Sequence, residues 1–387
     1  MRNVAIAGIG QTKFGERWDQ SLRALAAEAG NAAIADSGIE KTALETLFVG
    51  NMAGGKFAHQ EHIAALVATE LGITPIPATR VEAACASGAT AVRQAYLSVA
   101  SGLNDVALVV GVEKMSDLSA QEAVATLMAA SDQEWEAGIG ITFSGLYALM
   151  ARAHMHKYGT TEEQMAMVSV QNHKNAVGNK FAQFPFPVKL ETVMKSPMIA
   201  DPLKLLDCSP ITDGAAAAVF VSEDIAKKMA NPIWVRASSQ ASDTIALHER
   251  QSLTEMKATQ IAAKNAYATA KTDVKKIDVF EVHDCFSINQ IISLEGLGAA
   301  QIGKGGKFIE AGGSALDGES PTNTSGGLKA GGHPVGATGI RQIGDIVHQL
   351  RGTAKNQING AKTGLALNVG GSGATSVVHI LSNEVYV

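Results

Sequence analysis

The chain has 387 residues, of which 46% are hydrophobic and 18% are charged, and its formal net charge is −5. A chain of this length and composition can bury a large core, so a globally disordered protein is excluded. The acidic balance argues against a nucleic-acid or membrane-surface protein, and three scattered cysteines are too few for a disulfide scaffold.

Short apolar runs, bounded by glycine or polar turns, recur along the chain and are typical of strands buried on both faces. We expect strands at residues 4–6, 47–49, 106–110, 217–221, 279–282, 365–367 and 377–381. Alanine-rich segments between them carry apolar stripes of helical spacing, at Leu22, Leu25, Ala26 and Ala29 and at Val92, Ala95 and Val99. The alternation of strands and helices predicts a layered α/β architecture.

A faint internal similarity links residues 214–219 with residues 373–378, and each segment leads into an apolar run. It is explained either by chance or by two similar α/β halves, which we place at 1–230 and 231–387. Residues 116–206 have weak strand signals and predict a mostly helical insertion that covers one face of the first half. No leader and no apolar stretch of about 18 residues is visible, so we expect a cytoplasmic protein with reduced thiols.

The first candidate site is Cys85, which lies between an apolar run and the helix that bears Val92. At such a junction, free N–H groups and the helix dipole favour a thiolate. The alternative is a buried structural cysteine at the start of an alanine-rich helix, which is common for this residue.

The second candidate site is the segment 281–287, which follows directly from a predicted strand and contains His283 and Cys285. Ligands of α/β proteins bind at the carboxyl ends of strands, and residues two apart on an extended segment point the same way. A metal site formed by this His/Cys pair is conceivable, but a third ligand with suitable spacing is missing. The remaining alternative is an ordinary polar strand end.

Glycine-rich loops complete the pattern. Residues 326–339 frame His333 with glycines, and residues 368–373 again follow a strand with bare backbone. Gly8 and Gly10 also suggest a dinucleotide-binding motif, but the third glycine that this motif requires is absent. A cysteine, histidines and exposed N–H groups together favour nucleophilic acyl transfer.

In these motifs the chain resembles the thiolase superfamily along almost its whole length. The motifs, in order, are Gly8-Ile9-Gly10-Gln11-Thr12, Ala84-Cys85-Ala86-Ser87-Gly88, Asp207-Cys208-Ser209-Pro210, His283-Asp284-Cys285-Phe286, Gly331-Gly332-His333-Pro334 and Asn368-Val369-Gly370-Gly371.

The resemblance implies the thiolase fold, with two mixed five-stranded halves in a five-layer α-β-α-β-α arrangement. Residues 116–206 would be the loop domain that helps to hold coenzyme A. The resemblance also implies a homodimer or homotetramer that needs no metal and no organic cofactor, with coenzyme A thioesters as substrates.

The roles that the resemblance implies are specific. Cys85 would be the nucleophile and His333 its base, and the backbone N–H groups of Cys85 and Gly370 would form an oxyanion hole. Many thiolases have a second cysteine where this chain has Asn368. The His283-Asp284-Cys285-Phe286 form is similar to sterol-carrier-protein-type and archaeal thiolases, which implies that Cys285 supplies the acid/base thiol and His283 an oxyanion contact.

The implied activity is that of an acetyl-CoA C-acetyltransferase, which joins two acetyl-CoA molecules into acetoacetyl-CoA. Two alternatives are a longer-chain 3-ketoacyl-CoA thiolase and a non-catalytic scaffold subunit. Implied partners are hydroxymethylglutaryl-CoA synthase of the mevalonate route and a small zinc-ribbon/OB-fold protein. Cys208 is expected to be structural. The pairs His59/His62 and His154/His156 are expected to be surface or packing residues without a carboxylate partner.

Overall fold

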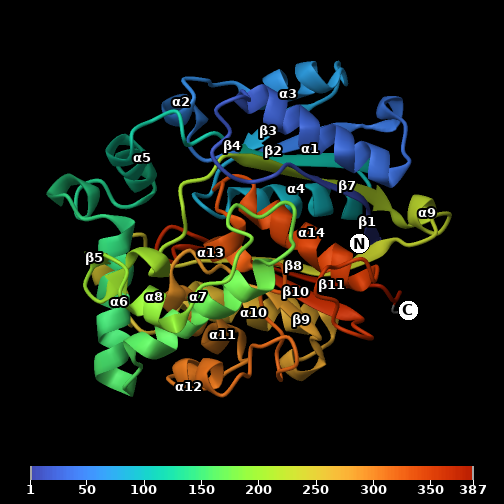
Figure 1. Cartoon of the computed structure of the whole chain (residues 1–387). Coiled ribbons are helices and arrows are strands. Elements are labelled where there is room, and N and C mark those ends of the chain that lie inside the picture. The colour runs from blue at the N-terminus through green and yellow to red at the C-terminus, as the bar shows by residue number, and fades with distance from the viewer. Residues whose placement is uncertain (1, 386–387) are drawn as a thin grey trace.

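The computed structural model describes residues 2–385, whose main sheet has nine strands in the order β3-β2-β4-β7-β1-β8-β11-β10-β9 (Figure 1). Each of the seven predicted apolar runs falls on one of these strands. Their bounds are β1 Val4–Gln11, β2 Thr46–Gly50, β3 Ala78–Val81, β4 Val106–Glu113, β7 Gly214–Ser222, β8 Ile233–Ser242, β9 Val279–Glu281, β10 Thr363–Gly370 and β11 Thr375–Ser382.

The sheet consists of two similar halves. In the first half β1, β7 and β4 are antiparallel neighbours, and β4, β2 and β3 are parallel. In the second half β8, β11, β10 and β9 repeat the same directions. The expected fifth strand there is reduced to one parallel bridge between Phe280 and Thr322, so the five-strand count is correct only for the first half. The strands of the repeat, β7 and β11, occupy equivalent places.

Three helical layers complete the predicted five-layer arrangement (Figure 1). α1 and α3 pack on the outer face of the first half, and α10 and α11 on that of the second. α4 and α14 lie between the halves, where their apolar side chains share one core with strands of both. The bounds are α1 Leu22–Ser37, α3 Ile63–Leu71, α4 Ser87–Ala100, α10 Lys257–Ala270, α11 Ser287–Leu297 and α14 Thr338–Leu350.

The early glycine motif serves the packing of α1 on β1. A Cβ atom at Gly10 would lie 2.2 Å from the carbonyl oxygen of Ala29, and one at Gly8 would lie 2.3 Å from that of Ala33. The helix therefore approaches the strand closely only because these positions lack side chains. This packing explains why both positions are glycine, so a dinucleotide-binding site is not needed to account for them.

The insertion is mostly helical, as predicted, but it lies elsewhere than expected. Its larger helices, α6 (Phe143–Tyr158) and α7 (Glu162–Ala176), share a core with α10 and α11, so the prediction that they cover the first half is wrong. Their apolar faces are buried against helices of the second half. The remaining short elements are α2 Gly54–Phe57, α5 Ala120–Leu127, α8 Leu190–Met194, β5 Met198–Ala200, β6 Leu203–Lys204, α9 Glu223–Ala226, α12 Gly305–Glu310 and α13 Gly327–Gly331.

Within residues 2–385, the helices are all too short or too polar to cross a membrane.

Candidate active site

Cys85 lies in a tight turn just before α4. Ala84 has a φ of 52°, which is uncommon for a residue with a side chain. The Ser87 hydroxyl braces the turn, because it accepts from the Ala83 N–H (2.9 Å) and donates to the Ala84 carbonyl (2.6 Å). α4 begins without a side-chain cap, and the N–H groups of Ala86 and Ser87 donate to the carbonyls of Ala83 (3.0 Å) and Ala84 (3.1 Å).

His333 approaches Cys85 from the second half of the chain. Its loop packs closely on the first half, since a Cβ at Gly88 would lie 2.7 Å from the Gly336 carbonyl oxygen. His333 Nδ1 lies 2.7 Å from the Thr338 hydroxyl, and that hydroxyl donates to the Pro334 carbonyl (3.0 Å). Because a hydroxyl has one proton, it accepts from Nδ1–H, which leaves His333 Nε2 unprotonated. The ring is thereby prepared to act as a base.

His283 has the opposite tautomer. The amide nitrogen of Asn368 lies 2.9 Å from His283 Nδ1. An amide nitrogen can only donate, so Nδ1 accepts and the proton is on Nε2. His283 Nε2 is buried and has no hydrogen-bond partner within residues 2–385. It is therefore an N–H donor that is free to meet a substrate oxygen.

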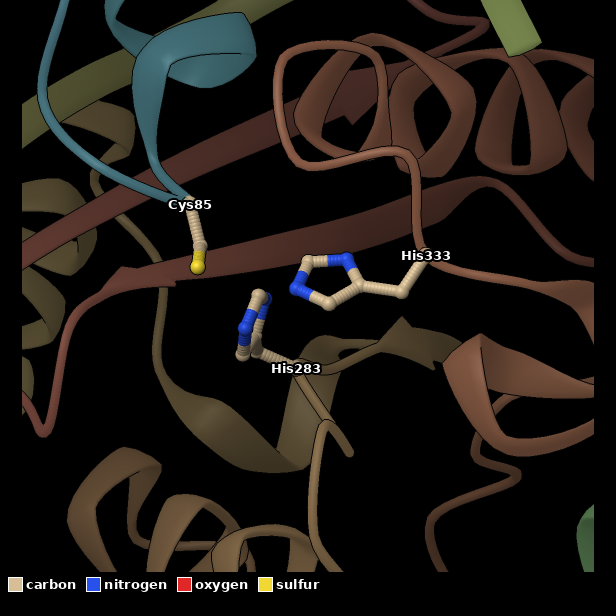
Figure 2. Close-up of side chains that lie close together, drawn as sticks. All are labelled: Cys85, His283 and His333. Atoms are coloured by element: carbon tan, nitrogen blue, oxygen red, sulfur yellow. The ribbon is translucent and has the colours of Figure 1, made fainter. Parts of the chain in front are cut away.

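These three side chains converge. The candidate ligand atoms of Cys85, His283 and His333 all lie within 4.8 Å of one another, and Figure 2 shows them meeting from three separate segments. The two imidazole rings are nearly perpendicular, with centroids 4.9 Å apart. One thiol, one base and one N–H donor thus face a common point. Thiol and imidazole groups also bind metal ions, and the expected absence of a metal stays a prediction.

Cys285 lies beside this group but outside the 4.8 Å cluster. Its buried thiol accepts from the Asn289 amide at 3.5 Å. The hydroxyl of Tyr147 also contacts this thiol and donates to the Gly371 carbonyl at 3.0 Å. The Tyr147 ring stacks on Phe286 with centroids 4.6 Å apart. Cys285 is therefore held by neighbours that sequence reasoning had not identified.

Burial controls the charge of the site. It raises the pKa of Cys85 to about 12 and that of Cys285 well above the usual value for a thiol. It lowers the pKa of His333 to about 3 and that of His283 well below the usual value. Burial therefore opposes the thiolate that the helix start at Cys85 would favour, because desolvation is the largest of the effects on the pKa of this thiol.

Backbone N–H groups also reach the Cys85 thiol. The N–H groups of Gly371 and of Cys85 itself are directed at the Cys85 sulfur, and both lower the pKa of the thiol. The predicted Gly370 lies next to them, where a Cβ would be 2.5 Å from the Ala83 carbonyl oxygen. Gly371 is thus an additional candidate oxyanion donor, and the role of Gly370 stays a prediction.

Glu113 is a further residue that the motifs did not reveal. Its buried carboxylate accepts from the N–H groups of Met52 (2.9 Å) and Ala53 (3.1 Å). Burial raises the pKa of Glu113 to about 7, and its charge adds to the rise at Cys85. Its position at the end of a predicted apolar strand was the available signal.

The other cysteine and the histidine pairs are not part of the clustered side chains, although the backbone of Cys208 bridges that of Phe286, the residue after Cys285. Cys208 donates its S–H to the Lys204 carbonyl at 3.3 Å. The side chains of three of the four paired histidines are exposed, and only His154 is buried. The expectation that no carboxylate accompanies the pairs His59/His62 and His154/His156 is wrong for one of them, because His154 Nε2 lies 3.3 Å from Glu295.

A cysteine thiol beside a neutral imidazole, between two similar α/β halves, is the arrangement expected of a thiolase-fold acyltransferase. Family models agree: "Thiolase, N-terminal domain" matches residues 4–224, and "Thiolase C-terminal domain-like" matches residues 239–383. The chain belongs to the thiolase family.

Individual relatives refine this placement. An acetyl-CoA acetyltransferase of Methanothermobacter thermautotrophicus is 55% identical over 99% of this chain and 100% of its own length. Sterol carrier protein 2 of Bos taurus is 35% identical over 97% of this chain and 72% of its own length. These relatives confirm the predicted relation to archaeal and sterol-carrier-protein-type thiolases. The solved structure of an "Ltp2-ChsH2(DUF35) aldolase" superposes with a TM-score of 0.87 at 28% identity and covers 99% of both chains.

Proposed function

We propose that this protein is an acetyl-CoA C-acetyltransferase, which interconverts two acetyl-CoA molecules with acetoacetyl-CoA and free CoA through an acyl-Cys85 intermediate. The convergence of the Cys85 thiol, the His333 base and the His283 N–H donor is the observation that carries this proposal (Figure 2). The 55% identical relative of that name supports the acetyl group as the transferred unit.

In the direction of thiolysis, the first step cleaves acetoacetyl-CoA. The Cys85 sulfur attacks the ketone carbon and its proton passes to His333 Nε2, while N–H groups of the Cys85 turn and Gly371 stabilise the oxyanion. The bond to the α-carbon breaks, and its electron pair takes the proton of the Cys285 thiol. His283 Nε2–H stabilises the enolate oxygen of the departing acetyl-CoA.

The second step releases the acyl group. Free CoA gives its thiol proton to the Cys285 thiolate and attacks the carbonyl of acetyl-Cys85. The Cys85 sulfur leaves and recovers its proton from His333, which restores the neutral site. Condensation is the reverse of these two steps. Because only protein groups and the substrate thiol take part, the proposal needs no metal or organic cofactor.

The oligomer, partners and location belong to the proposal as well. A homodimer is supported by β3, which is an edge strand of the sheet and leads directly to Cys85. The backbone groups along such an edge can pair with the same strand of a second copy. Assembly with a second protein, such as hydroxymethylglutaryl-CoA synthase of the mevalonate route or a zinc-ribbon/OB-fold protein, is supported by the likeness to the Ltp2-ChsH2(DUF35) aldolase, whose name joins two proteins. A cytoplasmic location is supported by three cysteines that are free of disulfides within residues 2–385.

Purified protein should catalyse both thiolysis of acetoacetyl-CoA and condensation of acetyl-CoA. Cys85→Ala should abolish both reactions, whereas the matched control Cys208→Ala should retain them. A wild-type protein that turns over only longer 3-ketoacyl-CoA substrates would make it a longer-chain thiolase. A folded wild type without any turnover would contradict the enzymatic proposal and favour a scaffold.

A further inference from the structure

A cavity of about 530 Å³ lies where three parts of the molecule meet, and none of the catalytic residues lines it. Its walls come from the end of β1 and from α1 in the first half, from residues 178–181 of the insertion, and from α14 with residues 353–356 of the second half. The volume is sufficient for a small organic ligand. The thiolase reaction gives this cavity no role.

The two carboxylates that line the cavity are already neutralised. Asp36 pairs with Arg351 at 2.7 Å and accepts from the Ile9 N–H at 2.9 Å. Asp345 pairs with Arg341 at 2.6 Å and accepts from a serine hydroxyl at 2.8 Å. Each of the two carboxylates therefore already has a guanidinium partner.

Two lysines of the wall have no such ion-pair partner in the described part of the chain. Lys180 and Lys355 come from different segments, and neither has a carboxylate partner within residues 2–385. Arg341 also lines the cavity and is only 4% exposed. Its Nη1 pairs with Asp345 at 2.6 Å and with Glu281 at 3.3 Å, whereas its Nε and Nη2 have no hydrogen-bond partner among the described residues. Buried N–H groups of a guanidinium are costly when unpaired, and they suit a phosphate or carboxylate oxygen.

We propose that this cavity is a second ligand site, which binds a small anion that carries two or more phosphate or carboxylate groups. One charged group of the ligand would meet Arg341 at the buried end, and the other would meet the ammonium groups of Lys180 and Lys355 at the mouth. The cavity is also connected to the catalytic centre through α14. This helix carries Arg341 and begins at Thr338, whose hydroxyl is hydrogen-bonded to His333. A bound anion would join all three parts of the molecule.

Isothermal titration calorimetry with pyrophosphate and, separately, with citrate tests the proposal on the wild type. One ligand per chain should bind, and the probe that binds more tightly identifies the favoured anionic group. The double variant Lys180→Gln/Lys355→Gln should weaken binding by about tenfold or more, since it removes two charge-assisted contacts. The matched control Lys257→Gln/Lys264→Gln makes the same charge change on exposed positions of α10 and should bind as the wild type does.

Three results would overturn the proposal. The first is that neither probe binds the wild type at millimolar concentration. The second is an equal loss of binding in both double variants, which would show that net charge alone attracts the anion. The third is a raised KM for CoA in the Lys180→Gln/Lys355→Gln variant, which would make the cavity part of the substrate site and not a second site.

Discussion

The tautomer of His283 depends on one side chain, Asn368, and its replacement gives the sharpest prediction about the site. Asn368→Leu keeps the approximate shape of the side chain but removes the amide that donates to His283 Nδ1 at 2.9 Å. The imidazole is then free to place its proton on Nδ1, which leaves an acceptor where the substrate oxygen needs a donor. Asn368 is thus a positioning residue that acts through His283.

The size of the effect follows from the loss of one preorganised donor. Removal of a single oxyanion-hole donor lowers kcat by about 10²- to 10³-fold. KM should change much less, because the donor acts on charge that develops in the transition state. The buried Nδ1 of His283 would also lack a partner, which costs about 1–3 kcal/mol of stability, so the variant must be assayed below its own melting temperature.

The assay is steady-state thiolysis of acetoacetyl-CoA, with kcat and KM resolved for Asn368→Leu and Asn368→Asp. A protonated carboxyl group can donate to Nδ1 as the amide does, whereas a carboxylate only accepts. The aspartate variant should therefore gain activity as the pH falls and lose it as the pH rises, while the leucine variant should show no such recovery. A leucine variant with kcat within about threefold of the wild type would refute the reasoning, because the loss of one such donor costs far more.

Three further outcomes are expected. Cys285→Ser should still take an acetyl group onto Cys85 but should lose condensation, as followed by product formation; normal condensation would show that Cys285 is not the acid/base group. Because burial raises the pKa of Cys85 to about 12, its alkylation by iodoacetamide should accelerate about tenfold per pH unit from pH 7 to 10, and a plateau below pH 9 would contradict this. Tyr147→Phe keeps the stack on Phe286 but removes the hydrogen bond to Gly371, so denaturant titration should show a loss of about 1 kcal/mol together with several-fold slower thiolysis. No change in either quantity would remove Tyr147 from the site.

The strands that could be predicted are those with continuous apolar runs, because burial on both faces leaves a plain signal. β8 could not be found in this way, since its second part, residues 237–242, consists only of polar and small residues. The fifth strand of the second half left no signal either, because only Thr322 makes the bridge. The side on which the insertion packs depends on contacts between distant segments, which periodicity does not encode.

The catalytic residues themselves were accessible to sequence reasoning because they lie in motifs at strand ends. Their charge states were not, because desolvation depends on the surrounding fold and here outweighs the helix terminus at Cys85. The tautomers were equally inaccessible, since Thr338 and Asn368 reach the histidines only in three dimensions. Tyr147 belongs to a helix of the insertion and approaches Cys285 across a large sequence separation.

The most direct test of the central claim is to identify the residue that carries the acyl group. Wild-type protein mixed with acetyl-CoA and quenched with acid should yield, by peptide mass spectrometry, one acetyl group on Cys85. The same adduct should form in Cys285→Ser and should be absent in Cys85→Ala. An acetyl group on any other residue, or turnover without an adduct on Cys85, would contradict the account.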